Sequence, residues 1–486
     1  MDYDQLKIIF FTNPLSCEPS TLYERYRSIG MLDSQKERLI GVENTMDMTM
    51  DIQALLQEYI DNSGAVGASV ALIDKGKTQF FSYGKKSVDR DELISEDTVF
   101  EIGSITKVFT TLALMNMVAK DEVQLDDPME IYLPGIKLPE LNGKKITLRH
   151  LAAHTSGIPR MPDNFDPKNP ANPYEDYTVE RLYDYLSHCT LTKVPGESFE
   201  YSNVGMGLLG YILSVRSAKS YEELIQSLIA EKLKMQDTSI SLTAEMSQNF
   251  ASGHHLRREV GYWDIPALSG AGAIRSNVKD MVQFLAANMG FSPSPIATLM
   301  QQCHQKQYEV MPQLDMGLAW LTSHSDQADI IWHNGGTGGF RSFLGFNPKT
   351  QKGLVILSNS TEDWPDEFGF LVLDPGYKRI LINNSLANDP DYLNKFVGSY
   401  NANVAALLSN GQPEQNLQIT LFGKQLSCAL SCGEVAMIYP EQFGVFGVKG
   451  FAGAKVQFTF DDQGKIKLIQ ASLPDGTIVW EAIPKP

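Results

Sequence analysis

The sequence predicts an α+β fold in which helices pack on a mixed antiparallel sheet, followed by a small all-β barrel. Strand-like runs occur near both ends of the first 388 residues with helical periodicity between them, so the sheet must combine distant segments. Beyond about Asn388, short strand-like runs alternate with turns. Because 486 residues exceed what one core usually supports, we expect an extension over 1–45, a main domain over 46–388 and a barrel over 389–486.

The main domain is expected to begin with a helix and a β-hairpin. Asp51–Ile60 carries apolar residues at helical spacing. The segments Val66–Leu72 and Thr78–Tyr83 are strand-like, and Asp74-Lys75-Gly76-Lys77 between them favours a tight turn. A further helix is expected from Ser104, because the apolar residues that follow form a single stripe.

The middle of the chain is helical and rich in loops, and strands return after it. Residues 163–174 contain three Pro and three Asn, which predicts a surface loop. Helices are predicted at Val179–Ser187, Val204–Val215 and Tyr221–Lys232. The returning strands are predicted at Met316–Leu321, Arg341–Phe346 and Gly353–Ser358. Barrel strands are predicted at Leu417–Leu421, Val435–Tyr439, Gln442–Val448, Val456–Phe460, Lys465–Ala471 and Thr477–Glu481.

Composition excludes several classes of protein. The net charge is −17 and the sequence has no basic run, so nucleic acid is not an expected partner. No stretch approaches the roughly twenty apolar residues that cross a bilayer. The five cysteines are odd in number and scattered, which predicts no disulfide framework. His254 and His255 are adjacent, so their side chains should point apart, and no metal site is expected.

Three S-x-x-K motifs occur, and their contexts differ. Ser104 opens the apolar helix, and Lys107 follows one turn later, where its ammonium group can reach the serine hydroxyl. The Ser104 N–H lies at a helix N-terminus, which favours a developing oxyanion. A buried lysine loses its charge readily and can then act as a general base. The non-catalytic alternative is a serine that caps the helix beside a lysine exposed to solvent.

The other two S-x-x-K motifs are poorer candidates for this chemistry. Ser82–Lys85 crosses a strand end, and Ser276–Lys279 lies at the exposed-looking start of a helix. Of two Y-x-N motifs, Tyr201–Asn203 places a phenol and an amide at a loop–helix junction, whereas Tyr392–Asn394 lies near the barrel. The glycine-rich run 333–340 would let backbone approach a substrate closely and would offer a second N–H to an oxyanion.

The order of these motifs resembles the serine β-lactamase and penicillin-binding protein superfamily. The resemblance is to its class C β-lactamase and DD-carboxypeptidase branch, with esterase and D-aminopeptidase relatives. It covers about residues 51–384 and includes the further blocks 151–158, 195–197 and 269–272. It implies a β-lactamase/transpeptidase-like fold with helices on both sides of the sheet and an all-helical subdomain. Residues 389–486 resemble the lipocalin-like domain of some members.

The resemblance also implies roles for individual residues. Ser104 would attack a carbonyl group and become acylated, while Lys107 and Tyr201 would share the proton transfers in an order that the sequence leaves open. Asn203 would hold the substrate amide, and the N–H groups of Ser104 and Gly336 would form the oxyanion hole. No cofactor or metal is implied.

His333-Asn334-Gly335 takes the place of the Lys-Thr-Gly run of most β-lactamases. That run supplies a fixed cation and a hydroxyl group to a substrate carboxylate, whereas an ordinary histidine, with a pKa of about 6.5, is only partly charged near neutral pH. Arg341 could replace the cation, or it could be a solvated strand-edge residue. His154 is predicted to be a structural hydrogen-bonding residue, and Glu197 to serve turn and capping geometry.

The predicted function is therefore that of a serine hydrolase acting through an acyl-enzyme on Ser104, with an amide, ester or β-lactam as substrate. Alternatives are a D-amino-acid-specific peptidase or DD-carboxypeptidase, a broad esterase, and a catalytically silent binding or sensor protein. The expected partner is a small molecule or short peptide. The oligomeric state is open. The sequence shows no convincing export signal and so predicts a cytoplasmic protein, whereas the family resemblance implies a periplasmic or extracellular one.

Overall fold

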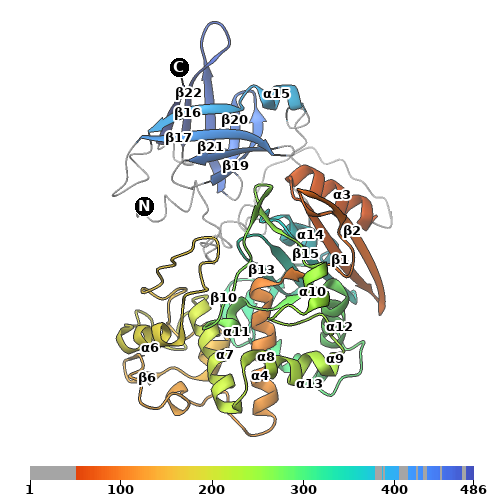
Figure 1. Ribbon diagram of the computed structural model, residues 1–486, viewed down its shortest axis with the longest axis vertical. Coiled ribbons are helices and arrows are strands. Elements are labelled where there is room, and N and C mark those ends of the chain that lie inside the picture. The colour runs from red at the N-terminus through yellow and green to blue at the C-terminus, as the bar shows by residue number, and fades with distance from the viewer. Residues whose placement is uncertain are drawn as a thin grey trace. The chain divides into compact units, whose positions relative to one another are not determined.

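The computed structural model describes residues 51–377, 386, 389–403, 414–422, 425–430, 435–448, 451–472 and 478–485. The extension predicted over 1–45 lies outside these residues. The described part of the chain divides into two compact units (Figure 1). One unit contains the elements from α3 (Ile52–Ser63) to α14 (Trp364–Leu373) except the last residues of α3, and the other contains the C-terminal barrel.

The larger unit is built on a nine-stranded sheet in the order β10-β11-β12-β13-β14-β15-β1-β2-β3. Each neighbouring pair in it is antiparallel, and Val70 of β1 pairs with Ile356 of β15. Distant segments thus meet in one sheet, as predicted. Its strands are β1 (Gly67–Asp74), β2 (Lys77–Ser87), β3 (Arg90–Leu93), β10 (Tyr308–Met311), β11 (Leu314–Met316), β12 (Leu321–His324), β13 (Asp329–Gly336), β14 (Arg341–Asn347) and β15 (Lys352–Ser358). Short two-stranded pairs join β4 (Phe100–Glu101) to β9 (Arg275–Ser276), β5 (Glu140–Leu141) to β6 (Lys144–Lys145), and β7 (Gly253–His255) to β8 (Arg258–Val260).

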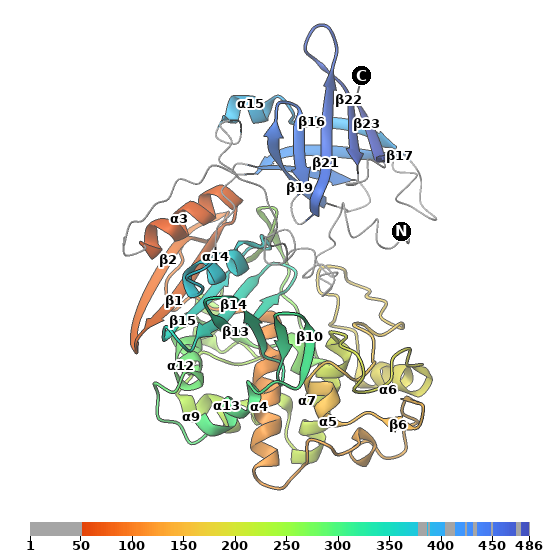
Figure 2. The same ribbon diagram turned by 180° about the vertical axis from the view of Figure 1, so that it is seen from behind.

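Helices cover both faces of this sheet, which confirms the predicted fold class (Figures 1 and 2). On one face, a Cβ at Gly353 would lie 3.1 Å from Leu285 of α12, and on the other a Cβ at Gly369 of α14 would lie 2.5 Å from Phe343. The helices are α3 (Ile52–Ser63), α4 (Thr106–Val118), α5 (Leu148–Ala152), α6 (Val179–His188), α7 (Asn203–Ser217), α8 (Tyr221–Ile225), α9 (Glu231–Leu233), α10 (Ala244–Asn249), α11 (Ser269–Gly272), α12 (Val278–Asn288), α13 (Ala297–Cys303) and α14 (Trp364–Leu373). Shorter turns are η1 (Gly103–Ile105), η2 (Met129–Ile131) and the π-helical η3 (Gln226–Ala230).

Most of the predicted elements are confirmed. The β1–β2 hairpin closes through Lys75 and Gly76, whose φ angles of 49° and 80° suit a two-residue turn. The predicted helix at Tyr221–Lys232 forms as α8, η3 and α9 in succession. Residues 163–174 contain no helix or strand, in agreement with the predicted loop.

Two predicted strands are wrong because a turn interrupts each of them. Met316–Leu321 spans the reversal between β11 and β12, where the Gly317 N–H donates to the Trp320 carbonyl at 2.7 Å and Ala319 has a φ of 61°. Gln442–Val448 contains the turn between β19 (Val435–Gln442) and β20 (Val445–Val448), where Gly444 has a φ of 70°. In both cases apolar residues continue through the turn, so the hydrophobic pattern does not mark it.

The C-terminal unit is a closed eight-stranded antiparallel barrel, which confirms the predicted small all-β barrel. Its interior is packed with aromatic rings: Phe396 lies 4.8 Å from Phe446 and 4.6 Å from Phe458 between ring centroids. The barrel elements are α15 (Pro390–Asn394), β16 (Gly398–Asn403), β17 (Glu414–Phe422), β18 (Gln425–Leu430), β19 (Val435–Gln442), β20 (Val445–Val448), β21 (Phe451–Phe460), β22 (Ile466–Ser472) and β23 (Ile478–Pro484). Among the described residues, none of the helices is long and apolar enough to cross a membrane.

Candidate active site

Ser104 lies in the 3-10 turn η1, which leads directly into α4. The Ile102 N–H before it donates to the Ile274 carbonyl at 3.1 Å, and the Ser342 hydroxyl donates to the Ile102 carbonyl at 2.8 Å. Gly103 has a φ of 51°, a conformation that favours glycine. Neighbouring strands therefore hold the turn on which Ser104 is presented at the start of the helix.

Lys107 is fully buried in the first turn of α4. Its Nζ lies 2.8 Å from Ser104 Oγ and donates to the carbonyl of Ala271, in α11, at 2.7 Å. Burial, aided by the nearby positive charge of Arg160, lowers the pKa of Lys107 well below its ordinary value. A lysine in this state can offer a lone pair to the serine hydroxyl proton.

The other two S-x-x-K motifs do not bring their serine and lysine together in this way. Ser82 Oγ is 2.9 Å from Ser69 Oγ, while Lys85 pairs with Asp91. Ser276 Oγ is 2.8 Å from Thr238 Oγ1, and Lys279 pairs with Asp97. The second Y-x-N motif lies on α15, where the Tyr392 hydroxyl accepts from the Gly444 N–H at 2.9 Å. Of the candidate motifs, Ser104–Lys107 is thus the one with its two side chains in contact.

Tyr201 lies beside this pair, just before α7. Lys107 Nζ is 4.9 Å from the centroid of the half-buried Tyr201 ring. The next residue, Ser202, caps α7 by accepting from the Gly205 N–H at 2.8 Å. Asn203 follows as the first residue of the helix, and its side-chain nitrogen is 3.7 Å from Met161 Sδ. The structure thus brings Ser104, Lys107 and Tyr201 together and places Asn203 at the helix start next to Tyr201.

His154 fixes the Tyr201 segment from behind. Its imidazole stacks on the Tyr201 ring with centroids 4.4 Å apart, and its Nδ1 accepts from the Ser202 N–H at 3.1 Å. Burial holds the pKa of His154 well below its ordinary value, and the nearby Lys107, His333 and Arg160 lower it further. These contacts confirm the prediction of a structural hydrogen-bonding histidine.

His333 is buried near the same group, with its ring centroid 6.3 Å from that of Tyr201. Burial and the nearby Lys107 lower its pKa to about 3, so the imidazole is uncharged at neutral pH. Its Nδ1 lies 2.5 Å from the Asn334 carbonyl oxygen, which can only accept, so Nδ1 carries the proton. Nε2 is then an acceptor, and it has no hydrogen-bond partner among the described residues. His333 therefore offers the site an acceptor and no cation.

Asn334 and Arg341 lie on the opposite face of the sheet, toward α14. The Asn334 amide donates to Asp366 at 2.7 Å, and the Arg341 side chain is 3.3 Å from Asp363. Successive side chains of a strand point to opposite faces of the sheet. Because His333 lies on the face toward Tyr201, Asn334 must lie on the other face. The structure does not bring Asn334 to Ser104, and it pairs Arg341 with an acid outside the site.

Gly335 and Gly336 pass close to the turn that carries Ser104. A Cβ at Gly335 would lie 3.0 Å from the Ser104 nitrogen and would collide with the Ile102 carbonyl. A Cβ at Gly103 would lie 2.7 Å from the Gly336 nitrogen. The absence of side chains at these positions lets the two backbones meet, which puts the N–H groups of Ser104 and Gly336 in the same part of the site.

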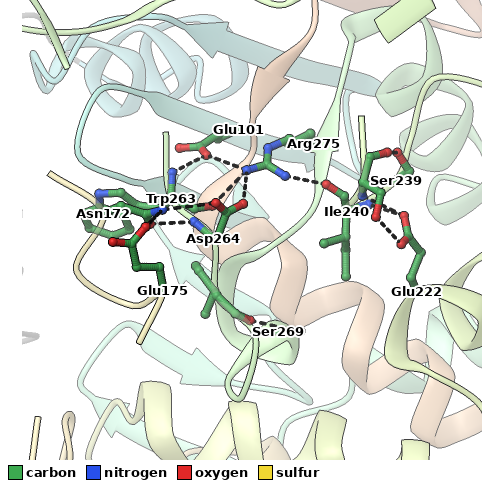
Figure 3. Close-up of polar contacts among 12 residues, drawn as sticks. Glu101, Asn172, Glu175, Glu222, Ser239, Ile240, Trp263, Asp264, Ser269 and Arg275 are labelled. Carbon is green, nitrogen blue, oxygen red and sulfur yellow. Dashed lines mark hydrogen bonds and ion pairs between the residues drawn. The ribbon is translucent and has the colours of Figure 1, made fainter. Parts of the chain in front are cut away.

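A partly buried ionic network surrounds Arg275 (Figure 3). The side chains of Glu101 and Arg275 are buried, whereas that of Asp264 is half exposed. Glu101 and Asp264 both point toward the Arg275 guanidinium, at 3.5 and 3.2 Å. Glu101 also accepts from the Trp263 N–H at 2.8 Å, and the Asn172 amide donates to Asp264 at 3.1 Å. The network ties β4, which precedes the nucleophile turn, to β9, to the Trp263–Asp264 segment and to the loop around Asn172.

Glu101 has an unusual protonation equilibrium within this network. Burial raises its pKa to about 7, against the opposing effect of the Arg275 charge. Its second carboxyl oxygen has no hydrogen-bond partner among the described residues. The carboxyl group behind the nucleophile turn therefore titrates near neutral pH.

The sequence motifs did not identify the carbonyl of Ala271, the Glu101–Arg275 pair or Arg160. Ala271 belongs to the block 269–272, and Arg160 lies two residues after the block 151–158, so closeness to these blocks was the only indication of them in the sequence. The Arg160 guanidinium carbon lies 5.3 Å from the centroid of the Tyr201 ring.

Comparison with known proteins decides the family. A family model described as Beta-lactamase matches residues 52–371. The chain belongs to the beta-lactamase family. This match confirms the resemblance drawn from the motifs. Membership of the family supports the general class of activity, that of a serine hydrolase.

Relatives of this beta-lactamase-family chain include a Staphylococcus aureus protein called Protein flp, 28% identical over 337 residues. The match covers 66% of this chain and 65% of that protein, so it spans less than two thirds of the relative. A Pseudomonas fluorescens protein named Beta-lactamase is 26% identical over 353 residues, covering 64% of this chain and 94% of that one.

Solved structures agree on the fold of this family member. A structure described as a class C beta-lactamase matches with a TM-score of 0.59 at 22% identity and covers 68% of this chain and 96% of that one. A beta-lactamase/D-alanine carboxypeptidase from Pseudomonas syringae matches with a TM-score of 0.60 at 22% identity and covers 67% and 98%. At these identities the likeness establishes the fold alone.

Proposed function

We propose that this chain is a serine hydrolase that forms an acyl-enzyme on Ser104, with Lys107 as the activating base. The contact that carries the proposal is the 2.8 Å approach of Lys107 Nζ to Ser104 Oγ. Lys107 is fully buried, its pKa is strongly lowered, and it pairs with no carboxylate among the described residues. A free amine beside a serine hydroxyl at a helix N-terminus is the arrangement that nucleophilic catalysis requires.

In the proposed acylation step, the Lys107 amine takes the proton from the Ser104 hydroxyl as Oγ bonds to the substrate carbonyl carbon. The resulting oxyanion is bound by the N–H groups of Ser104 and Gly336. The intermediate then collapses, and the bond from the carbonyl carbon to the leaving group breaks. Protonated Lys107 and the Tyr201 phenol are the two groups placed to return a proton to the leaving group.

Deacylation repeats these steps with water as the nucleophile. Water adds to the acyl carbonyl carbon and gives up a proton to Lys107 or Tyr201. The ester bond to Ser104 Oγ breaks, Oγ is reprotonated, and a carboxylic acid leaves. Asn203, at the start of α7 next to Tyr201, is proposed to hold the polar part of the acyl group.

The substrate is proposed to be an ester or amide more readily than a β-lactam. A neutral His333 and an Asn334 turned toward Asp366 do not reproduce the fixed cation and hydroxyl of a Lys-Thr-Gly run. Two matching structures are described as beta-lactamase/D-alanine carboxypeptidases, so a D-amino-acid peptidase is the second candidate.

Labelling with a fluorophosphonate tests the nucleophile. Wild-type protein should be labelled and Ser104→Ala should not, while the control Ser82→Ala, in a second S-x-x-K motif, should behave like wild type. Equal labelling of wild type and Ser104→Ala would overturn the assignment. Absence of labelling in correctly folded wild type would favour the alternative of a silent binding protein.

Incubation with a penicillin, followed by intact mass and drug concentration, tests the substrate class. A lasting adduct on Ser104 would indicate a DD-peptidase-like site, and consumption of the drug would indicate a β-lactamase. We expect neither to be efficient, with esters and D-amino-acid amides hydrolysed faster. Rapid turnover of penicillin would contradict the proposed preference.

A further inference from the structure

Arg160 is a cation at the edge of the proposed active site. Its guanidinium carbon lies 5.3 Å from the Tyr201 ring centroid. Its backbone is fixed at the same place, because the Arg160 carbonyl accepts from the Asn203 N–H at 3.0 Å. The side chain thus extends from the segment that holds Tyr201 and Asn203.

Arg160 has no acidic partner among the described residues. No ion pair or side-chain hydrogen bond of this residue is found there, and its Nε is buried without a hydrogen-bond partner. Its buried Nε donor has lost water without gaining an acceptor, which is costly, and its other donors have no acidic partner among the described residues. An anion bound during function would satisfy them.

The charge of Arg160 acts on the catalytic group. It contributes, after burial, to the lowered pKa values of Lys107 and His154. It also opposes the rise in the pKa of Tyr174, which burial brings to about 12. The positive charge of Arg160 therefore acts on both Lys107 and Tyr174.

The other candidate cations do not serve this purpose. His333 is neutral with a pKa of about 3, and the pKa of Lys107 is lowered well below its ordinary value. Arg341 pairs with Asp363 toward α14. Among these groups, Arg160 is the guanidinium that has a buried, unpartnered Nε and no acidic partner among the described residues.

We infer that Arg160 binds an anionic group of the substrate and so makes the hydrolase selective for esters or amides that carry a carboxylate. This inference rests on the proposed function. A guanidinium presents its donors in a planar fork that matches a carboxylate, and such charge-assisted pairs are strong. Arg160 would act as a specificity-determining residue, because it contacts the substrate away from the reacting bond.

Two matched pairs of activated esters test the inference. One pair has 3-carboxyphenol or 3-carbamoylphenol as the leaving group, and the other has a glutaryl or 4-carbamoylbutanoyl acyl group on 4-nitrophenol. Wild type should prefer the carboxylate member in at least one pair. Arg160→Gln should reduce that preference, measured as the ratio of kcat/KM values, by roughly 10- to 100-fold.

The ratio separates substrate recognition from effects on the base. Removing the Arg160 charge also changes the pKa of Lys107, but that change affects both members of a pair equally at one pH. Arg160→Lys should keep part of the preference, and Arg341→Gln should keep all of it. Thermal melting of each variant checks that the fold is intact.

Several results would overturn the inference. These are no charge preference in wild type, an equal loss on both members of a pair in Arg160→Gln, or loss of the preference in Arg341→Gln. If Ser104→Ala hydrolyses the esters as fast as wild type, the proposed function itself fails. If hydrolysis depends on Ser104 but the charge preference does not depend on Arg160, only the inference fails.

Discussion

At the scale of single residues, the proposed chemistry depends on the burial of Lys107 away from water. Lys107 keeps two hydrogen-bonding contacts, Ser104 Oγ and the Ala271 carbonyl, and neither is an anion. Taking an amine out of water disfavours its charged form, so the environment that makes Lys107 basic toward serine also destabilises the fold. Stability and reactivity should therefore respond in opposite directions when this group is removed.

The variant Lys107→Met separates these two effects. Met fills similar volume without a titratable group, so labelling of Ser104 by a fluorophosphonate should fall by about 10²–10⁴-fold without loss of stability. In wild type the unfolded chain binds a proton up to about pH 10.5 while folded Lys107 does not, so its free energy of unfolding rises with pH up to that value. The stability advantage of Lys107→Met should shrink over the same range in urea titrations. An advantage that is constant with pH would show that Lys107 titrates normally.

The Ser104–Lys107 pair could be predicted because a one-turn spacing on a helix brings two side chains together whatever surrounds them. The position of Asn334 could not be predicted in this way. Its face depends on the register of β13 against β14, where Asn334 pairs with Phe343, and on the packing of α14 behind that strand. Arg160 was missed because it belongs to no motif, and only the fold brings it to Tyr201.

At the scale of elements, several strands and loops converge on the nucleophile turn. β4 and β9 pair beside it, and Glu101 and Arg275, which face each other across that pair, link it to the Trp263–Asp264 segment. Because burial raises the pKa of Glu101 to about 7, the stability of the β4–β9 pair should depend on pH near neutrality.

The variant Glu101→Gln tests this sensitivity. The pKa of Glu101 is raised from 4.5 to about 7, which corresponds to about 3 kcal/mol. Below pH 4.5 the group is neutral in both states. Between pH 4.5 and 7 only the unfolded chain loses the proton, so this group lowers the free energy of unfolding as pH rises, and the effect is complete above 7.

Glu101→Gln lacks this titration. Its free energy of unfolding relative to wild type should therefore increase by up to about 3 kcal/mol between pH 4.5 and 8, measured by urea denaturation. The pKa of about 7 already includes the opposing attraction of Arg275, so the lost ionic contact needs no separate correction. Parallel pH profiles for the two proteins would contradict the assigned pKa.

The element pattern was largely predictable, and the failures have two causes. Helical periodicity located α3, α4, α6 and α7, because one face of each packs on the core. The turns after Met316 and before Val445 escaped because apolar residues run through them, and only a backbone with positive φ reveals the reversal. The strand β16 was missed because polar residues dominate its sequence, Gly398–Asn403.

At the scale of the whole molecule, the larger unit is sufficient for the family fold. Matching solved structures are covered over 96–98% of their own length by 66–68% of this chain, and the family model ends at residue 371. The barrel has its own core of aromatic and aliphatic side chains, including Phe396, Phe446 and Trp480. Packed rings in the barrel interior give no support to binding of a small apolar ligand there.

Deleting the residues after Asn388 should therefore leave labelling of Ser104 largely intact while changing which substrates are hydrolysed. The measurement compares the rate of fluorophosphonate labelling and a panel of ester substrates between the full chain and the truncated chain, with melting curves to establish folding. A folded truncation that no longer labels would show that the barrel is needed for the chemistry.

Mass spectrometry of the intact protein during turnover of an activated ester tests the central claim most directly. The account predicts a transient mass increase equal to the acyl group, located on the peptide that contains Ser104, with no such species in Ser104→Ala and slow formation in Lys107→Met. Turnover at the wild-type rate by Ser104→Ala, or an acyl group located on another residue, would contradict it.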